Sequence, residues 1–590
     1  MRGFWRLASG VVALLIAASA LAADPGKVLR IAFPVAETGF DPVKVSDLYS
    51  NTVNEAIFDT LLTYDYLARP AKLVPKTTDG MPEVSDGGRT YLIHLKRGIY
   101  FAPDPAFKGE RRELVAEDYV YSFKRFADPK NRSPYAFMIQ GRIEGLDDAT
   151  ERAKKTGRFD YDAVIPGMVA LDKYTLRFKL TKVDYLFPYT LAHAVFGAVA
   201  REVIEAYASD TNGHPVGTGP YMLKEWRRGA RIVLEANPNF REEVWDFQPT
   251  KDPWDRDVVA AMQGKTLPQI GRIEISVIEE SQSRWLAFNR KELDLLAVPA
   301  TFVREALDDQ NNLKPEWVAQ KVSLFRAIDP SIGYSFYNFR DPILGGFTRE
   351  KIALRRAINM GYELGQEIAV IAKNQEIQAQ MPIPYGVVGY DPDYRNVDQY
   401  DPALANKLLD WFGYKRGADG YRTLPDGKPM VIHMATGTAA IDREYSELWK
   451  RSMDAIGIRM VFDPGKFADQ LKAAKACQLM MWQAAWTADY PDGDNFMQLF
   501  YGPNTGESNN GCYESKAFDA LYERSLTLPP ASVERQQLFI DMTRQEQVDG
   551  AWSLHSSPIR NQLIRPWVKG YKKHPILNAE WVYMDLEPRS

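Results

Sequence analysis

Residues 479–496 read LMMWQAAWTADYPDGDNF, an apolar run that leads into an aspartate and a polar turn. The first eight residues predict a buried strand, and the Pro, Gly, Asp and Asn residues at the end predict a turn. Asp489 therefore follows a buried strand, where a carboxylate has lost much of its water and needs a cation nearby. No Lys or Arg lies between Lys475 and Lys516. We expect an ammonium group of a ligand to supply that cation.

Other interpretations of this segment do not require a ligand ammonium. Aspartate often caps a turn with its own side chain, and Asp489 precedes a turn sequence. Asp489, Asp492 and Asp494 could also form a calcium loop or a pair of catalytic acids. Their spacing does not match the twelve-residue calcium pattern, and no glutamate closes it. A solvated turn explains Asp492 and Asp494 better.

The N-terminus has the order of a secretory signal peptide. Arg2 and Arg6 precede a short apolar segment, and Ala20-Leu21-Ala22 forms an A-x-A cleavage site. The apolar segment is shorter than the ~20 residues of a membrane span, and no cysteine stands at the cleavage site to carry a lipid. We expect residues 1–22 to be removed and the mature chain, starting at Ala23, to act outside the cytoplasm.

Composition narrows the class of protein. The chain has 590 residues, enough for several domains of ~100–200 residues each. Its 73 Lys and Arg residues against 77 Asp and Glu residues give a formal net charge of -4. Because the two signs are interspersed without a basic stripe, nucleic acid is not an expected partner. The six histidines are scattered, and the chain contains no G-x-S-x-G, Walker or H-E-x-x-H motif. We expect no metal and no other cofactor.

The two cysteines, Cys477 and Cys512, leave a question open. An exported protein can oxidise such a pair to a disulfide. The predicted strand and its turn lie between them, however, and a bridge needs the two Cα atoms within ~7 Å. The bridged and the reduced form both stay open on the sequence alone.

Hydrophobic periodicity predicts strands and helices that alternate along the chain, without a repeat. This order is typical of an α/β protein with mixed sheets and several lobes. Residues 217–221 contain two glycines, but their proline lacks an N–H and so excludes a phosphate-cradling loop. The predicted strands are residues 28–33, 91–95, 171–180, 232–236, 273–278 and 458–462, and the predicted helices are residues 47–62, 115–127, 349–359 and 442–456.

Short segments spread over nearly the whole mature chain carry a family resemblance. The segments are FDP (residues 40–42), ELVAEDYVYSFKR (113–125), SPYA (133–136), GTGPY (217–221), NPNF (237–240), LRRAI (354–358), WTADY (486–490) and RPWVKGY (565–571). In this order they resemble those of the periplasmic oligopeptide-binding proteins, the family 5 solute-binding proteins that serve ABC importers. Each segment is weak alone, and their common order carries the resemblance.

The resemblance implies a periplasmic binding protein type II-like clamshell with an extra inserted lobe and mixed β-sheets. Lobe I would comprise residues 23–48, 198–328 and 557–590. Lobe II would comprise residues 49–197, and lobe III residues 329–556. A ligand would lie between jaws that hinge together.

The resemblance also implies site residues. In the family, an extended peptide pairs its backbone with the protein, which gives affinity with little sequence preference. The family's ammonium-binding aspartate matches Asp489, and its neighbouring pocket tryptophan matches Trp486. For Trp486, Tyr135 and Phe467 the alternative is ordinary core packing. The further expected ligand contacts are Tyr135, Thr218, Ala36, Glu37, Phe467, Gln483 and Tyr490.

The sequence departs from the family at positions that hold the ligand carboxylate. Gln483 stands where some members have an arginine for this purpose. The arginine of dipeptide-specific members has no match in residues 436–438, and Thr487 replaces a cysteine of close relatives. Capture of the ligand's amino end is therefore supported, and capture of its other end is not. Arg443 is a candidate carboxylate partner, with ordinary surface charge as the alternative.

The sequence thus predicts a monomeric periplasmic receptor that is not an enzyme. It would bind short peptides and deliver them to an inner-membrane ABC permease complex. One alternative is a non-peptide or peptide-like ligand on the same scaffold, such as an antibiotic, a murein fragment, a metal chelate or haem. A second alternative is an exported hydrolase with paired acids such as Asp489 and Asp492. The sequence contains no nucleophile motif that would support it.

Overall fold

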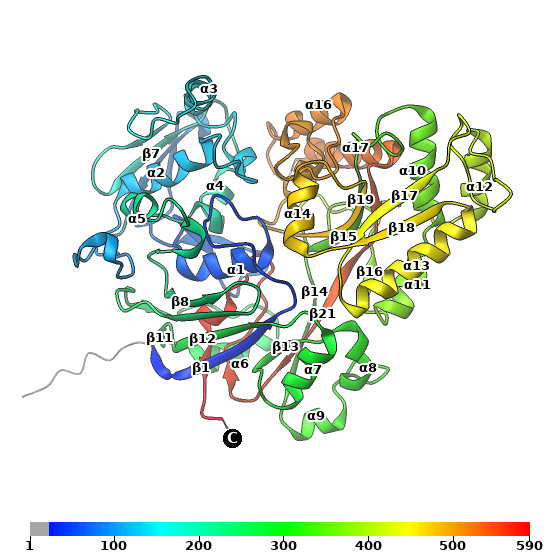
Figure 1. The fold of residues 1–590 in the computed structure, drawn as a ribbon. Helices are drawn as coiled ribbons and strands as arrows, with labels where there is room; N and C mark the ends of the chain where they lie inside the picture. Colours follow the sequence, from blue (N-terminus) through cyan, green and yellow to red (C-terminus); the bar gives the residue numbers. More distant parts are fainter. Residues whose placement is uncertain (1–22, 531, 590) are drawn as a thin grey trace, which may run out of the picture.

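The computed structural model describes residues 23–530 and 532–589, and the predicted signal peptide, residues 1–22, lies outside the described residues. The described chain forms two bodies, one along the left and the bottom of Figure 1 and the other at its upper right. We call residues 24–328 with 556–589 the first body, and residues 331–554 the second body. None of the helices described is both long and apolar enough to cross a membrane.

Mixed sheets organise the first body. The sheet at its base has the order β1-β12-β9-β8, with β1 and β12 parallel and the other neighbours antiparallel. An antiparallel sheet of order β4-β5-β7-β6 lies further out, and β21 pairs with β13 and β14 of this body and with β16, a strand that residues of the second body contribute. The strands are β1 (Asp24–Phe33), β4 (Glu83–Ser85), β5 (Thr90–His94), β6 (Met168–Ala170), β7 (Thr175–Lys179), β8 (Tyr221–Arg227), β9 (Arg231–Ala236), β12 (Ile270–Val277), β13 (Leu295–Ala297), β14 (Ser323–Ile328), β16 (Glu376–Gln378) and β21 (Ser556–Ile564).

One five-stranded sheet organises the second body, in the order β18-β17-β19-β15-β20. The strand β19, which was predicted from the opening segment, lies at its centre. Three two-stranded ladders complete the described strands. The strands of the large sheet are β15 (Ser331–Tyr337), β17 (Val431–Thr436), β18 (Arg459–Pro464), β19 (Met481–Thr487) and β20 (Trp552–Leu554), and those of the ladders are β2 (Leu62–Tyr64), β3 (Leu73–Pro75), β10 (Glu243–Val244), β11 (Thr266–Leu267), β22 (Val568–Lys569) and β23 (Asp585–Leu586).

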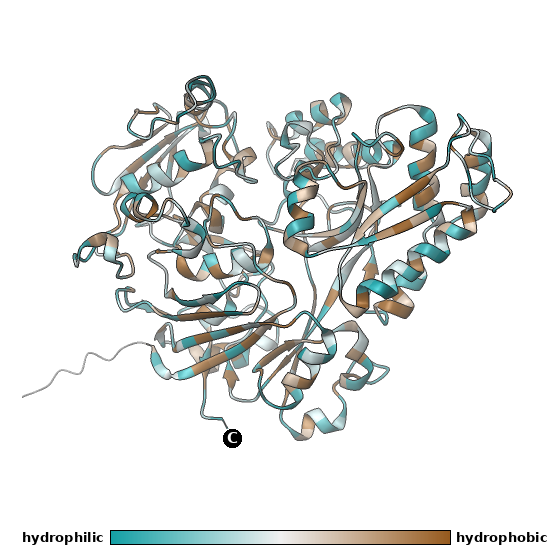
Figure 2. Ribbon diagram, in the orientation of Figure 1, coloured by the Kyte–Doolittle hydropathy of each residue, from teal (hydrophilic) through white to brown (hydrophobic). Residues whose placement is uncertain are grey.

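Helices cover the sheets, and Figure 2 shows hydrophobic residues concentrated on the strands while outer helices such as α13 carry many hydrophilic residues. The helices are α1 (Leu48–Ile57), α2 (Ala116–Ala127), α3 (Leu146–Thr156), α4 (Phe187–Thr190), α5 (Arg201–Ala206), α6 (Trp254–Met262), α7 (Ser281–Asn289), α8 (Val303–Ala306), α9 (Pro315–Ala319), α10 (Arg349–Gly361), α11 (Leu364–Gln366), α12 (Pro402–Trp411), α13 (Ala440–Ile456), α14 (Phe467–Lys475), α15 (Asp494–Met497), α16 (Lys516–Ser525) and α17 (Val533–Asp549).

The chain passes between the two bodies at two adjacent places. The strand β14 ends at Ile328 and β15 begins at Ser331, and β20 ends at Leu554 while β21 begins at Ser556. Two short connections side by side between rigid sheets are the usual construction of a hinge. The predicted α/β fold with mixed sheets is confirmed, while the predicted lobe boundaries stay a prediction.

Most predicted elements are present, but the helix predicted for residues 47–62 is wrong after Ile57. There the chain leaves α1 and continues to the strand β2. The carbonyl of Ile57 accepts the backbone N–H of Gly219 at 2.8 Å. A Cβ atom on Gly217 would lie only 2.0 Å from the same carbonyl oxygen. The two glycines of residues 217–221 therefore allow close packing on the end of α1.

Two of the family-like segments meet in a buried ion pair. The guanidinium of Arg125 on α2 donates to both carboxylate oxygens of Asp41, each at 2.9 Å. Both side chains are at most 4% exposed. Burial alone would raise the pKa of Asp41, but the charge and hydrogen bonds of Arg125 hold it below its usual value. These residues support the fold of the first body.

Cys477 and Cys512 form a disulfide, with their Cα atoms 6.2 Å apart. The sheet of the second body brings the two cysteines together. Asn338, just after β15, brings both cysteines to the same end of the sheet. Its side-chain amide donates to the carbonyl of Cys477 at 2.7 Å, and the next residue donates its N–H to Gly511 at 2.8 Å. The loop after β19 thus returns to the start of that strand.

Candidate ligand-binding site

A cavity of about 730 Å³ lies between the two bodies. From the first body it is lined by the loop after β1, the start of α1 and the start of β21. From the second body it is lined by β15, β17, α13, α14 and β19. Its volume is within the range of small-molecule sites, and a site between two bodies joined by a hinge is a common position for one.

Asp489 lines this cavity and accepts hydrogen bonds from three neutral side chains. The Nδ2 of Asn495 donates to Oδ2 at 2.9 Å, and the hydroxyl of Tyr135 donates to Oδ1 at 3.4 Å. The Nε2 of His193 lies 3.4 Å from the same Oδ1. Among the described residues, no Lys or Arg nitrogen lies within 4.0 Å of this carboxylate. Its side chain is 17% exposed.

The tautomer of His193 follows from the hydrogen bond at its Nδ1 atom. The backbone N–H of Val195 donates to Nδ1 of His193 at 3.3 Å. A nitrogen that accepts a hydrogen bond carries no proton, so Nε2 holds the proton of a neutral imidazole and donates it to Asp489. In this tautomer His193 contributes a hydrogen bond to Asp489, whose carboxylate faces the cavity between the two bodies.

The backbone of β19 also faces the cavity. β15 pairs with β19 along its whole length, from Met481 to Thr487. β17, on the other side, pairs only with Met481 and Trp482. The rest of β19 therefore has a free edge on that side, and its residues 483–487 line the cavity. The sequence predicted a buried strand, but this half of β19 is only partly buried. Ala485 is exposed and its neighbours are half-buried.

Four of the ten predicted site residues line the cavity, namely Asp489, Trp486, Phe467 and Gln483. The indole N–H of Trp486 donates to Asn495 at 3.1 Å, which ties it to the same amide that holds Asp489. Phe467, at the start of α14, packs near Trp482 with ring centroids 5.9 Å apart. Tyr135 is only 1% exposed and reaches the site through its hydrogen bond with Asp489.

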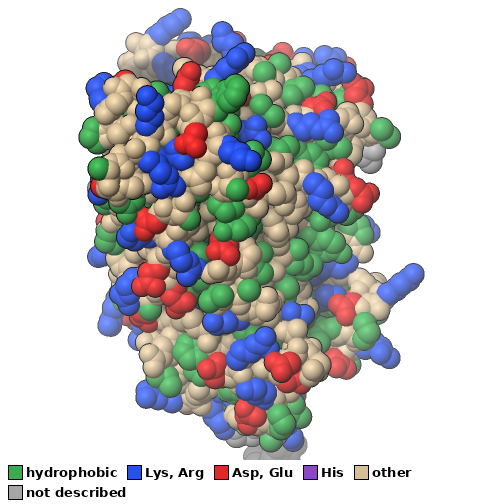
Figure 3. Space-filling model, turned by 90° about the vertical axis from the view of Figure 1, so that its right-hand side faces the viewer, with side chains coloured by type: hydrophobic (Ala, Val, Ile, Leu, Met, Phe, Trp, Pro, Cys, Tyr) green, Lys and Arg blue, Asp and Glu red, His purple; other side chains and the backbone are tan. Residues whose placement is uncertain are grey.

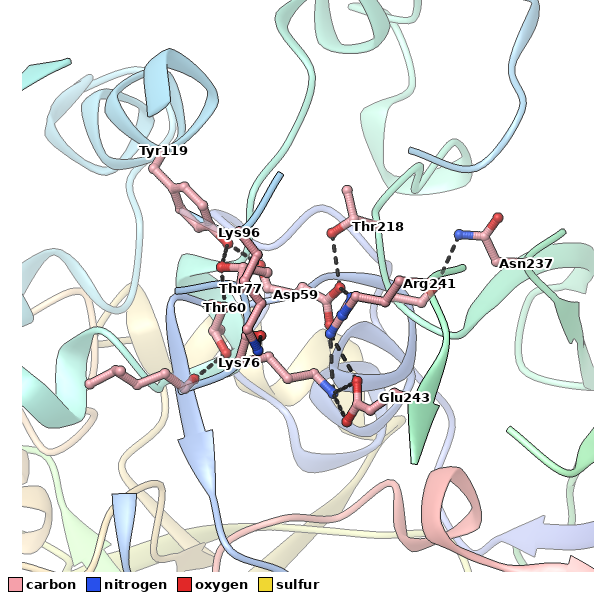
Figure 4. A network of polar contacts seen from close by, with 12 residues as sticks. Asp59, Thr60, Lys76, Thr77, Lys96, Tyr119, Thr218, Asn237, Arg241 and Glu243 are labelled. Atoms are coloured by element: carbon pink, nitrogen blue, oxygen red, sulfur yellow. Dashed lines mark hydrogen bonds and ion pairs between the residues drawn. The ribbon is translucent and has the colours of Figure 1, made fainter. Parts of the chain in front are cut away.

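Thr218 lies away from the cavity, in a buried ionic network (Figure 4). Its hydroxyl donates to Asp59 at 3.1 Å, and Arg241 donates to the same carboxylate oxygen at 2.7 Å. Glu243 and Lys76 complete a group of two acids and two bases. Thr218 is 1% exposed, so in this structure it acts as a hydrogen-bond donor inside the first body.

The remaining four predicted residues also lie outside the cavity lining. Glu37 is buried and accepts from the indole of Trp226 at 2.6 Å, and Ala36 adjoins it, while the preceding residues 34 and 35 line the cavity. Tyr490 is buried and donates to Asp494 at 2.5 Å. Arg443 is on the exposed side of α13, which is the alternative that the sequence left open for it.

The solvated turn predicted after Asp489 is wrong. Asp492 is 1% exposed and accepts two hydrogen bonds from Arg535, at 2.7 and 2.8 Å. Asp494 is fully buried. The turn packs against α17, which supplies Arg535, so a residue from more than forty positions away provides the partner. Asp492 does not line the cavity, and the pair of catalytic acids with Asp489 finds no support in this arrangement.

The charge that lines the cavity is predominantly negative. Eight Asp and Glu residues line it, against four Lys and Arg residues. Of the bases, Arg560 is paired with Asp329 at 2.7 Å. Lys475, which the sequence analysis did not select, donates to Ser46 of the first body at 3.0 Å. Burial lowers its pKa to about 8, although nearby acids oppose this shift. No local sequence signal marks these bases, because they come from distant elements.

The fold and site together define a class: two bodies joined by a double connection around a cavity that carries a free strand edge and a carboxylate without a cation. This is the construction of a binding protein that closes around a solute. Residues 72–508 match the family described as bacterial extracellular solute-binding proteins, family 5 Middle. The chain belongs to the bacterial extracellular solute-binding proteins of family 5.

Similar proteins cover nearly the whole chain. The periplasmic oligopeptide-binding protein OppA of Escherichia coli is 24% identical over 605 residues, covering 97% of this chain and 96% of that protein. Heme-binding protein A of Haemophilus influenzae is 23% identical over 551 residues, covering 92% and 89%. The periplasmic binding protein DppA from Helicobacter pylori, solved in complex with the peptide STSA, has a TM-score of 0.75 at 21% identity, covering 95% and 98%. All three are described as binding proteins.

Proposed function

We propose that this protein binds short peptides with a free amino end and holds the terminal ammonium on Asp489. It would do so in the periplasm, after removal of residues 1–22, and deliver the peptides to an inner-membrane ABC permease complex. Jaws that close around the ligand would correspond to the predicted lobes, with the hinge at residues 329–330 and 555. Similarity to OppA and to the peptide complex of DppA supports this proposal.

The surroundings of Asp489 carry the proposal. A carboxylate that is mostly removed from water and accepts only neutral hydrogen bonds lacks the counter-charge that buried charges normally have. A ligand ammonium would supply this charge and would donate up to three charge-assisted hydrogen bonds. The tautomer of His193 makes this argument stronger, because an imidazolium would have supplied the charge internally.

The free edge of β19 supports an extended peptide as the ligand. Backbone groups on an open strand edge can pair with the backbone of an added strand, whatever side chains the ligand carries. Asp489 lies two residues beyond the end of this edge. A peptide paired with residues 483–487 would therefore have one terminus near Asp489.

The test is direct identification of the ligand, followed by binding. The protein is purified from a native extract, its bound ligand is released by denaturation, and mass spectrometry identifies it. We expect short peptides. Calorimetry with the emptied protein then compares tripeptides with their N-acetylated forms, which lack the ammonium. We expect the acetylated peptides to bind about a hundredfold more weakly. Equal affinities for both forms would refute the role of Asp489.

A non-peptide ligand is the second candidate, because one relative is a haem-binding protein. Haem needs an axial ligand for its iron. The histidine that lines the main cavity is His555, and both its nitrogens are engaged, by Glu367 at 2.9 Å and by Ser335 at 3.2 Å. This favours peptide over haem. If the mass-spectrometry experiment detected a released porphyrin, haem would be favoured over peptide as the ligand.

A further inference from the structure

The negative charge of the cavity is concentrated in a second place besides Asp489. We call Glu367, Glu376, Tyr445, Trp449 and His555, which all line the cavity, the acidic pocket. It lies on the other side of β15 from β19, since β15 pairs with β19 along one edge and with β20 along the other. His555 follows β20, and Glu376 pairs with the next strand segment, at Pro558. The acidic pocket thus lies on the β20 side of the sheet, about two strand spacings, or about 10 Å, from β19.

Within the acidic pocket, two side chains donate to Glu367 and one donates to Glu376. Glu367 accepts from the hydroxyl of Tyr362 and from Nδ1 of His555. Glu376 accepts one hydrogen bond, from the hydroxyl of Ser556 at 2.5 Å. Among the described residues, no Lys, Arg or His nitrogen lies within 4.0 Å of the Glu376 carboxylate. Burial and the adjacent Glu367 raise the pKa of Glu376 to about 7, against the hydrogen bond of Ser556 and the charge of His555, which both lower it.

Aromatic side chains and an unused donor complete the acidic pocket. Trp449 is fully buried, and its indole N–H has no hydrogen-bond partner in the described residues. An unpaired buried donor is costly, so a ligand acceptor such as a peptide carbonyl would stabilise it. Tyr445, one turn before it on α13, has its pKa raised by burial and by the charges of Glu376 and Glu367. Aromatic faces beside carboxylates are favourable surroundings for Lys and Arg side chains.

We propose that the acidic pocket receives a basic side chain of the ligand, with Glu376 as its carboxylate partner, so that the preferred substrates are peptides that carry Lys or Arg. This inference rests on the proposed function, because it takes Asp489 as the partner of the amino end. The two carboxylates would then bind two positive groups of one ligand. Asp489 and the acidic pocket line the same cavity, and so do Gly333 and Tyr334 of β15 between them. A ligand held by Asp489 would therefore reach the acidic pocket across the face of β15.

Calorimetry at about pH 8, where Glu376 is mostly ionised, tests the proposal. The ligands are Ala-Ala-Ala and tripeptides with a single lysine at position two or three. Each lysine peptide is matched by one with Nε-acetyl-lysine, which keeps the length and removes the charge. We expect lysine to bind at least about tenfold more tightly than acetyl-lysine at one of the two positions. In Glu376→Gln this ratio should fall to near one.

The control variant is Glu279→Gln, which removes a carboxylate at the exposed rim of the same cavity. We expect it to keep the lysine preference. Equal binding of lysine and acetyl-lysine peptides would overturn the inference, as would an unchanged preference in Glu376→Gln with a native melting temperature. Failure of the proposed function is distinguishable, since Ala-Ala-Ala would then bind no better than its N-acetylated form. If no peptide bound at all, both would be refuted.

Discussion

Replacement of Asp489 by asparagine is the sharpest test of the site, because it removes one charge and keeps the shape. Asn495, Tyr135 and His193 all donate to this carboxylate. The Nδ2 of the new amide would face one of these donors, so one hydrogen bond is lost, at about 1–3 kcal/mol of folding free energy. The fold should persist, and thermal unfolding checks that it does.

The effect on binding is larger and depends on the ligand's charge. Removing one half of a fully buried charge pair costs about 3–5 kcal/mol, and hydrogen bonds to a charged group contribute about 1.5–3 kcal/mol. Because the Asp489 side chain keeps 17% exposure, we take ~3 kcal/mol, which is roughly a 150-fold loss of affinity for a peptide with a free amino end.

The assay is a thermodynamic cycle by calorimetry. Native protein and Asp489→Asn are each titrated with a tripeptide and with its N-acetylated form. The acetylated peptide has no ammonium, so it should bind both proteins with similar affinity, and the coupling should be ~3 kcal/mol. Glu279→Gln serves as the control for a general loss of negative charge. An equal loss for both peptides would show that Asp489 acts through the fold, and the reasoning would be refuted.

Further predictions concern the residues that hold the fold. Asp41→Asn leaves Arg125 buried without its partner and should lower the free energy of unfolding by about 3–5 kcal/mol in urea titrations. The pKa of Asp41 is lowered in the folded protein, so its contribution to stability is present above the unfolded value near 3.8 and is lost as the pH falls through the lower folded value. Acidification below about pH 4 should therefore destabilise the native protein more than Asp41→Asn, in melting curves. The double variant Cys477→Ser/Cys512→Ser opens a loop with a sequence separation of 35 and should lose about 3–4 kcal/mol of unfolding free energy; unchanged stability would show that the bridge is not formed. Thr218→Val should lower stability by about 1 kcal/mol and leave peptide affinity unchanged, and a large loss of affinity would return Thr218 to the site.

Charge on the visible surface agrees with the composition. Figure 3 shows Lys and Arg interspersed with Asp and Glu on that face, without a continuous basic area. The formal net charge of -4 conveys the same balance. The local concentration of acid in the cavity is therefore a feature of the site and is not inherited from the overall composition.

The sequence was sufficient for features that depend on neighbours along the chain. The alternating pattern predicted strands such as β1, β5 and β12, and the apolar stripe and acidic first turn predicted α2. Asp489 could be selected as well, because an apolar run, a lone carboxylate and the lack of nearby bases are all local facts. The helix of residues 47–62 failed after Ile57 because a distant glycine segment takes the carbonyl that would have continued it.

Only the tertiary structure decided which charges are already paired. Asp489 and Asp492 are three residues apart, yet Arg535 from α17 neutralises Asp492, while no Lys or Arg of the described residues pairs with Asp489. It also decided that the cysteines meet, that Thr218 faces Asp59, and that Glu376 joins the cavity from another strand. A salt bridge needs its two charged groups within about 4 Å, and the sequence does not specify which distant side chains come that close. The chain itself thus determined where a charge stands, and the packing of two bodies determined whether it still needs a partner.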